Sequence, residues 1–271
     1  MWLLILAAAQ VEGQVGDGVA GQCRANVVVT GYWPPTNEML RQFSQRTQQN
    51  AGGWQGGNWR DSGYDVFAFF PEFPPDGDPT NDEIGQIGSV GGQDADLRVD
   101  YQDTSRDFWR IMDTYQPRIL ITSSRGGDIG WEIEAYEGGH GAAGDWISDR
   151  WGEQTQPTAE SIDPRSTQAI RQYADNVVRS SLPIHAIAHA TRALRLTSVQ
   201  IDTETSGSYL SGFMGLHGIF YHQTHLDNVA AGHIHVGRHV EPAVAKRLFE
   251  ATLAAVLAQH PLDCRQLTQG E

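Results

Sequence analysis

The chain has 271 residues, of which 39% are hydrophobic and 19% are charged; this suits a folded domain with a filled core and excludes a disordered segment. The formal net charge of −14 would repel a phosphate backbone, so we expect no nucleic acid partner.

The first nine residues, MWLLILAAA, form an apolar run that ends where the chain turns polar at Gln10. The run is far too short to span a membrane, and it resembles the apolar part of a secretory signal peptide. No Lys or Arg precedes it, so two alternatives stay open: a secreted or periplasmic protein with a cleaved signal, or a cytoplasmic protein with an N-terminal tail. We therefore expect residues 1–21 to lie outside the fold and residues 22–271 to form a single α/β domain.

The sequence contains two cysteines, Cys23 and Cys264, and neither has the spacing of a metal ligand. In an exported protein they could pair and join the two ends of the domain, whereas in a reducing compartment they would be free thiols. The sequence leaves both alternatives open.

In the first half of the chain, short apolar segments alternate with an amphipathic one, which is typical of an α/β sheet. β-Branched and aromatic residues predict strands over residues 26–30, 64–70 and 118–122. An apolar stripe between the last two predicts a helix over residues 103–115, with Asp103 or Ser105 as its N-cap.

In the second half, we expect helices over residues 167–179, from Pro183 onward, over 211–221 and over 242–259, and strands over 199–203 and 229–236. Two long polar connections, about residues 34–62 and 135–164, are typical of functional loops. Together these elements predict a three-layer αβα sandwich with a mixed, mostly parallel central sheet.

The carboxyl ends of the strands are where such a sheet binds its ligands, and reactive side chains of three kinds lie at or after the ends of predicted strands. Ser211 begins a predicted helix, His235 lies near the end of the last strand, and Glu132 and Glu134 follow the strand over residues 118–122. A hydroxyl, an imidazole and a carboxylate are the parts of a nucleophile, its base and an orienting acid. A serine at a helix start is also typical of a simple N-cap, so this pattern alone does not show whether Ser211 is a nucleophile or an N-cap.

Three segments resemble pyroglutamyl peptidase I: VVVTGYWP at residues 27–34, SGSYLS at 206–211 and GHIHV at 232–236. In that family the second segment carries the nucleophilic cysteine and the third the catalytic histidine, with a similar separation. The resemblance covers most of the chain from about residue 26 and implies that family's α/β fold.

The resemblance also implies a function: a hydrolase that cleaves a pyroglutamyl-type amide at the N-terminus of a peptide or a small amide, with no cofactor and no metal. Ser211 would be the nucleophile and His235 the base. Glu132 is the first choice for the acid and Glu134 the second; the two share one face if their segment is a strand. The residues implied in substrate binding are Tyr32, Trp33, Tyr209 and Leu210. Self-association into a homo-oligomer is left open.

The departures from the family keep two alternatives open. Ser211 stands where the family has cysteine, and Gly212 replaces an asparagine, so the chain could be a catalytically inactive homologue that binds a ligand. The other alternative is a metal-dependent hydrolase, because histidines are concentrated near the C-terminus: His217, His222, His225, His233, His235 and His239.

Overall fold

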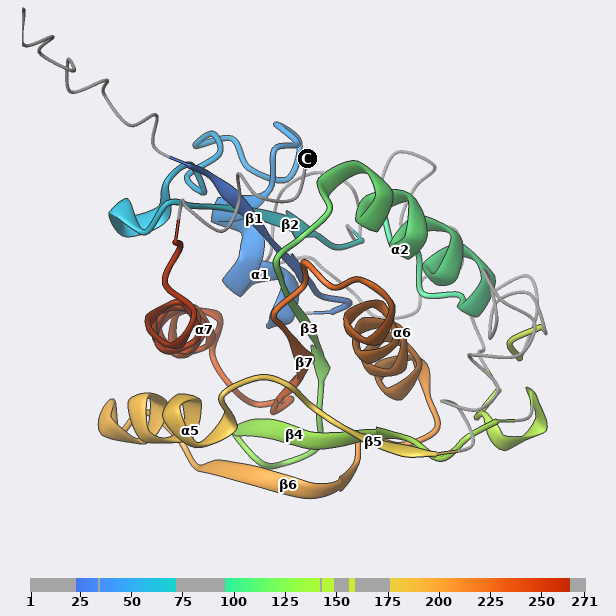
Figure 1. Ribbon diagram of the computed structural model, residues 1–271. Helices are drawn as coiled ribbons and strands as arrows, with labels where there is room; N and C mark the ends of the chain where they lie inside the picture. Colours follow the sequence, from blue (N-terminus) through green and yellow to red (C-terminus); the bar gives the residue numbers. More distant parts are fainter. Residues whose placement is uncertain are drawn as a thin grey trace, which may run out of the picture.

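The computed structural model describes residues 23–33, 35–71, 96–141, 143–148, 156–158 and 176–263. A seven-stranded sheet forms its centre in the order β2-β1-β3-β7-β4-β5, with β6 paired to β4 (Figure 1). The strands are β1 (Ala25–Thr30), β2 (Tyr64–Phe69), β3 (Ile119–Arg125), β4 (Trp131–Gly138), β5 (Val177–Arg179), β6 (Val199–Thr205) and β7 (Ala230–Val236).

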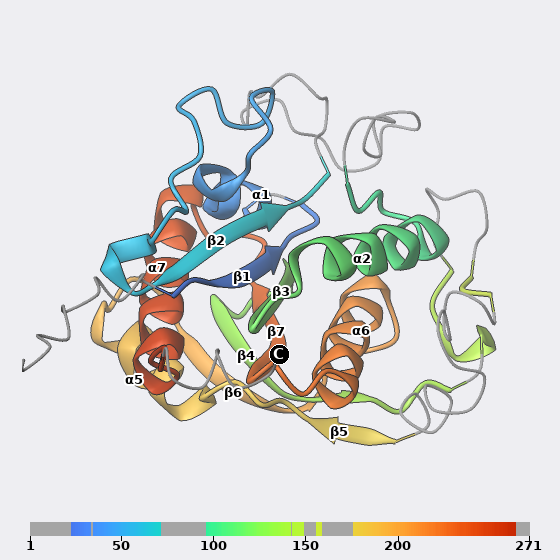
Figure 2. The same cartoon turned by 45° about the horizontal axis from the view of Figure 1, so that its top comes forward.

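Helices cover both faces of this sheet. The α-helices are α1 (Thr36–Leu40), α2 (Tyr101–Tyr115), α5 (Ile184–Ala193), α6 (Leu210–Thr224) and α7 (Pro242–Gln259), and three short 3-10 helices are η1 (Arg41–Phe43), η2 (Trp59–Asp61) and η3 (Ala143–Asp145). In Figure 2, α2 and α6 lie on one side of the sheet and α1, α5 and α7 on the other. The predicted α/β architecture, a helix-flanked sheet, is therefore confirmed.

The sheet is mixed and mostly parallel, as predicted. β1 pairs in parallel with β2 and β3, β3 pairs in parallel with β7, and β4 pairs in parallel with β6. The antiparallel pairs both involve β4, which runs against β7 and β5. The carboxyl ends of β1, β3 and β7 consequently share one edge, and β4 begins at that same edge.

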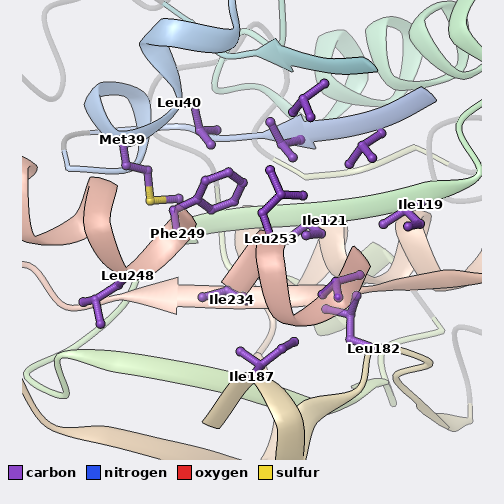
Figure 3. Packing of buried hydrophobic residues seen from close by; sticks show 14 of the residues in the cluster. Met39, Leu40, Ile119, Ile121, Leu182, Ile187, Ile234, Leu248, Phe249 and Leu253 are labelled. Atoms are coloured by element: carbon purple, nitrogen blue, oxygen red, sulfur yellow. The ribbon is translucent and has the colours of Figure 1, made fainter. Parts of the chain in front are cut away.

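Two apolar cores follow from the alternation of side chains along the strands. One lies between the sheet and α1, α5 and α7, and Figure 3 shows Ile121 and Ile234 of the sheet beside Phe249 and Leu253 of α7. The other lies under α2 and α6 and includes Val28, Leu120 and Ala231. Neighbouring residues of one strand thus pack into opposite cores, so the sheet is joined to the helices on both of its faces.

Three sequence-based predictions need correction. The cap of α2 is Asp100, whose carboxylate accepts hydrogen bonds from the backbone N–H groups of Gln102 and Asp103, because the helix begins two residues earlier than predicted. Residues 177–179 form β5 and not the end of a helix, since they pair with β4; the rest of that predicted helix, up to residue 175, lies outside the described residues.

The third correction concerns the two connections predicted as long loops. The first contains α1, η1 and η2, and the second half of β4 occupies the start of the second. Thr36 begins α1 by accepting the backbone N–H groups of Tyr32 and Trp33 on its hydroxyl, so the chain turns directly into a helix after β1.

Cys23 is disulfide-bonded, while Cys264 and the predicted signal or tail over residues 1–21 lie outside the described residues. None of the helices in the described part of the chain has both the length and the apolar character that a membrane span requires.

Candidate functional site

Strand β4 sets the geometry of the acidic residues. Trp131, Ile133 and Ala135 point into the core under α5 and α7, so the alternation of the strand turns Glu132 and Glu134 toward the α6 side. Glu132 lies directly opposite His235 in the antiparallel pairing with β7.

Glu134 is the carboxylate that binds His235. Its Oε1 lies 2.6 Å from His235 Nδ1, whereas Oε2 of Glu132 lies 3.8 Å from the same nitrogen, beyond hydrogen-bonding distance. Glu132 instead accepts a hydrogen bond of 2.6 Å from Gln200 Nε2. The sequence placed Glu132 first and Glu134 second, and the direct hydrogen bond is made by Glu134.

A hydrogen bond from Nδ1–H to a carboxylate leaves Nε2 as the proton acceptor of the imidazole. No group in the described part of the chain bonds to His235 Nε2, and the side chain remains 11% exposed. His235 can therefore accept a proton from a ligand at its open end.

Burial controls the chemistry of Glu134, whose side chain has no exposed surface. Desolvation raises the pKa of Glu134, and the hydrogen bond and charge of His235 oppose that rise. The neighbouring carboxylates of Glu132 and Asp202 raise it further. The ionised form of Glu134 thus depends on its contact with His235, which links the two side chains electrostatically.

His233 lies next to His235 on the same face of β7. It is fully buried, its ring centre lies 4.8 Å from that of His235, and its two nitrogens lie 2.8 and 2.9 Å from the hydroxyls of Thr122 and Ser124. Burial lowers the pKa of His233 well below its usual value, and the charge of His235 adds to this. His233 is therefore a neutral structural residue between β3 and β7.

Polar side chains on the α6 side of β3, β4 and β7 form a stripe, here called the polar stripe: Thr122, Ser124, Glu134, Glu137, His233 and His235. Helix α6 packs on the polar stripe through glycines. A Cβ at Gly215 would lie 2.5 Å from the carboxyl group of Glu137, and one at Gly218 would lie 3.4 Å from Thr122. Ser211 precedes these glycines by one and two turns, so helical spacing places it on the same face of α6.

Ser211 itself is partly exposed in the first turn of α6. Its Oγ lies 3.4 Å from the carbonyl oxygen of Ser206, to which it donates a weak hydrogen bond. Ser211 and His235, both described, share no hydrogen bond. The structure thus joins the predicted base to an acid, and it places the predicted nucleophile on the helix face that packs against the same stripe.

The turn before α6 requires two glycines. Gly207 has a φ of +85°, and a Cβ at Gly212 would lie only 1.8 Å from the carbonyl oxygen of Gly207. No side chain fits at residue 212 in this turn, which accounts for glycine where the resembled family has asparagine. No side chain caps α6, so the N–H groups of its first turn are free of such a partner.

Glu137 is a site residue that the sequence analysis missed. It is fully buried, and it accepts a short hydrogen bond from the hydroxyl of Ser206. Burial and the charge of Glu134 raise its pKa well above the usual value, so Glu137 is held as the neutral acid. Regular alternation along WEIEAYEG would turn Glu137 away from Glu134, and a register shift between Glu134 and Tyr136 brings it to the α6 side, so no sequence pattern pointed to Glu137.

The four residues implied in substrate binding lie together near the start of α6. Trp33 stacks on Tyr209, with ring centres 6.3 Å apart, and its ring is 6.1 Å from that of Tyr32. Tyr32 is buried and its hydroxyl lies 2.9 Å from that of Thr104, while Leu210 is fully buried in the core. Of the four, Tyr209 is the most exposed.

The C-terminal histidines do not gather at one point. His217 lies in the core 3.0 Å from Ser105, His222 bonds Asn228, and His225 stacks on Tyr221. Within the ranges that the structure describes, the group of three side chains suited to hold a metal ion is Glu132, Glu134 and His235, whose ligand atoms all lie within 4.8 Å of one another.

Comparison with solved structures identifies the fold. No protein-family model matches the chain, and no curated protein matches its sequence. A pyrrolidone carboxyl peptidase from Thermococcus litoralis is 15% identical with a TM-score of 0.57, over 86% of this chain and 94% of that one. A mutant pyrrolidone carboxyl peptidase from P. furiosus is 16% identical with a TM-score of 0.58, over 88% and 100%.

A third structure, pyroglutamyl peptidase I from Bacillus amyloliquefaciens, is 12% identical with a TM-score of 0.56, over 87% of this chain and 98% of that one. All three matches extend over nearly the whole of each solved chain. The chain therefore has the fold of the pyrrolidone carboxyl peptidases.

Proposed function

We propose that the chain is a pyroglutamyl peptidase I-like hydrolase that cleaves a pyroglutamyl-type amide at the N-terminus of a peptide, with Ser211 as its nucleophile. The observation that carries the proposal is the buried hydrogen bond of 2.6 Å between Glu134 and His235, on the stripe against which the Ser211 face of α6 packs. The match in fold to pyrrolidone carboxyl peptidases supports it.

In this mechanism Ser211 Oγ attacks the carbonyl carbon of the scissile amide while His235 Nε2 takes its proton. The carboxylate of Glu134 stabilises the imidazolium that forms. The N–H groups in the first turn of α6 stabilise the oxyanion, because they carry the positive end of the helix dipole and no side chain caps them. His235 then protonates the leaving amine, and a water molecule hydrolyses the acyl-enzyme by the same route in reverse.

A serine makes stricter demands on the site than a cysteine does. A thiol is partly ionised near neutral pH, whereas a hydroxyl must lose its proton to a base during the attack. Ser211 Oγ must therefore leave the carbonyl oxygen of Ser206 and approach His235 when substrate binds. Catalytic hydrogen bonds that are absent without substrate often form in the substrate complex.

The test is hydrolysis of a pyroglutamyl-coumarin amide by the wild type, Ser211→Ala and Ser211→Cys. Activity in the wild type that disappears in Ser211→Ala, with both proteins equally folded, is the expected result. Activity only in Ser211→Cys would show that the pocket and His235 are retained and that the natural chain is an inactive homologue. No hydrolysis by any of the three would refute the pyroglutamyl substrate class.

A metal-dependent hydrolase is the second candidate, favoured by the grouping of Glu132, Glu134 and His235. One oxygen of the buried Glu134 carboxylate has no hydrogen-bond partner among the described residues, as a metal ligand would require. In that case a bound divalent ion would activate water, and the serine would be dispensable. Hydrolysis that survives Ser211→Ala and is lost on dialysis against a chelator would select this candidate.

A further inference from the structure

Arg125 is a half-buried cation at the edge of the site. It ends β3 directly after Ser124, the residue that pairs with His235 across β3 and β7. Its guanidinium carbon lies 5.4 Å from the centre of the Trp33 ring, and Trp33 stacks on Tyr209 just before α6. Arg125 is thus next to the aromatic residues implied in substrate binding.

The guanidinium group of Arg125 has no carboxylate partner among the residues that the structure describes. Arg41 and Arg46, which are also partly buried, are ion-paired: Arg41 binds Glu38, and Arg46 lies 2.8 Å from Asp96. Arg118, which is partly buried as well, has no carboxylate partner among the described residues. Arg125 thus lacks a carboxylate partner in a chain where 33 acidic side chains outnumber 19 basic ones.

The surroundings of Arg125 disfavour its positive charge. Burial lowers the pKa of Arg125, the nearby charge of Arg238 lowers it further, and the interaction with Tyr209 opposes this shift in part. Arg238 is ion-paired with Asp128, at 2.9 Å, whereas Arg125 has no carboxylate partner among the described residues. An anionic group bound beside Arg125 would relieve this cost.

We propose that Arg125 binds a carboxylate of the substrate, so that the site selects short peptides with a free carboxylate close to the scissile amide. The proposal rests on the proposed function and deepens it. The Trp33 ring lies beside the guanidinium group, whose N–H groups have the geometry to bind both oxygens of a carboxylate. Binding of a substrate carboxylate would explain why a cation that has no carboxylate partner among the described residues lies at the site.

The test compares pyroglutamyl-alanine, which has a free carboxylate, with pyroglutamyl-alanine amide. Calorimetry in a Ser211→Ala background measures the binding of each ligand without hydrolysis. A charge-assisted hydrogen-bonded pair predicts that the acid binds about tenfold to a hundredfold more tightly than the amide. Arg125→Gln should remove this preference, and Arg125→Lys, which keeps the charge without the fork, should retain part of it.

Arg247→Gln is the matched control, because Arg247 is exposed on α7 at the other face of the sheet and its loss changes the net charge equally. This control should keep the full preference. Equal affinity for acid and amide, no measurable binding of the acid at millimolar concentration, or a preference that survives in folded Arg125→Gln would overturn the proposal.

The proposed function is tested separately by hydrolysis. If the acid is preferred through Arg125 but nothing is hydrolysed, the site binds acidic peptides without cleaving them, and only the proposed function fails. If the wild type hydrolyses acid and amide equally well, the catalytic proposal stands and the role of Arg125 is refuted.

Discussion

The choice between Glu134 and Glu132 as the acid that orients His235 gives the sharpest prediction. We expect Glu134→Gln to reduce kcat far more than Glu132→Gln does. Glu134 is at hydrogen-bonding distance from His235 Nδ1 and fully buried, whereas Glu132 is 3.8 Å away and bound to Gln200. An amide at residue 134 could present N–H to Nδ1 and so favour the wrong imidazole tautomer.

The magnitude follows from the two distances. With an effective dielectric constant of about 20, the gross attraction to an imidazolium is about 6 kcal/mol at the 2.6 Å of Glu134 and about 4 kcal/mol at the 3.8 Å of Glu132. Only the first is also a hydrogen bond. Replacement of the acid in a Ser-His-Asp triad lowers kcat by about 10⁴. We therefore expect losses of about 10³–10⁴ for Glu134→Gln and about tenfold for Glu132→Gln.

The assay is steady-state hydrolysis of the pyroglutamyl-coumarin amide, with kcat and KM determined separately for the two variants. KM should change little, because neither carboxylate contacts the substrate in the proposed mechanism. Thermal denaturation checks that both variants are folded. A larger loss of kcat in Glu132→Gln than in Glu134→Gln would refute the assignment.

Three further predictions concern the buried groups around the site. Burial raises the pKa of Glu137 above its usual 4.5, so the folding stability that Glu137 contributes falls as pH rises beyond that value. In urea unfolding at pH 8, Glu137→Gln should therefore be more stable than the wild type by roughly 1–3 kcal/mol. A less stable variant would contradict this. The pKa of His233 is lowered below 6.5, so stability is lost as pH falls below that value. His233→Gln should flatten this loss in urea midpoints measured from pH 7 to pH 5, and an unchanged slope would exclude His233 as its source. In thermal denaturation, Gly215→Ala should lower the free energy of unfolding by roughly 1–3 kcal/mol, because its Cβ would meet the Glu137 carboxyl group. Gly144→Ala, with no atom within 4 Å of its Cβ, should leave the stability nearly unchanged in the same measurement.

The parts of the fold that the sequence predicts well are those with a strong local pattern. The helix at residues 242–259 has proline in its first turn and a periodic apolar face, and its predicted bounds are those of α7. The β-branched run before Gly31 likewise predicts β1 to within one residue. In these segments a single local period suffices, because one element buries one continuous apolar surface.

Strand β4 could not be assigned from its sequence alone. Its charged glutamates alternate with apolar residues, and the strand is fixed by pairing with β6 and β7, which follow it by more than 60 residues. The choice between Glu132 and Glu134 depended on the same distant pairing. Arg125 carried no motif, and its exceptional environment depends on Trp33, from a different strand end.

The two buried carboxyl groups of β4 divide the acid chemistry between them. Burial raises the pKa of Glu137 well above its usual value, and the charge of Glu134 raises it further. Glu137, with its strongly raised pKa, accepts the hydrogen bond of Ser206 before α6, while Glu134 binds His235, whose hydrogen bond and charge favour the ionised form of Glu134. Environments that separate the pKa values of paired carboxyl groups assign them different roles. In the proposed mechanism a serine depends more than a cysteine does on an ionised carboxylate beside the imidazolium, because the hydroxyl loses its proton only during the attack.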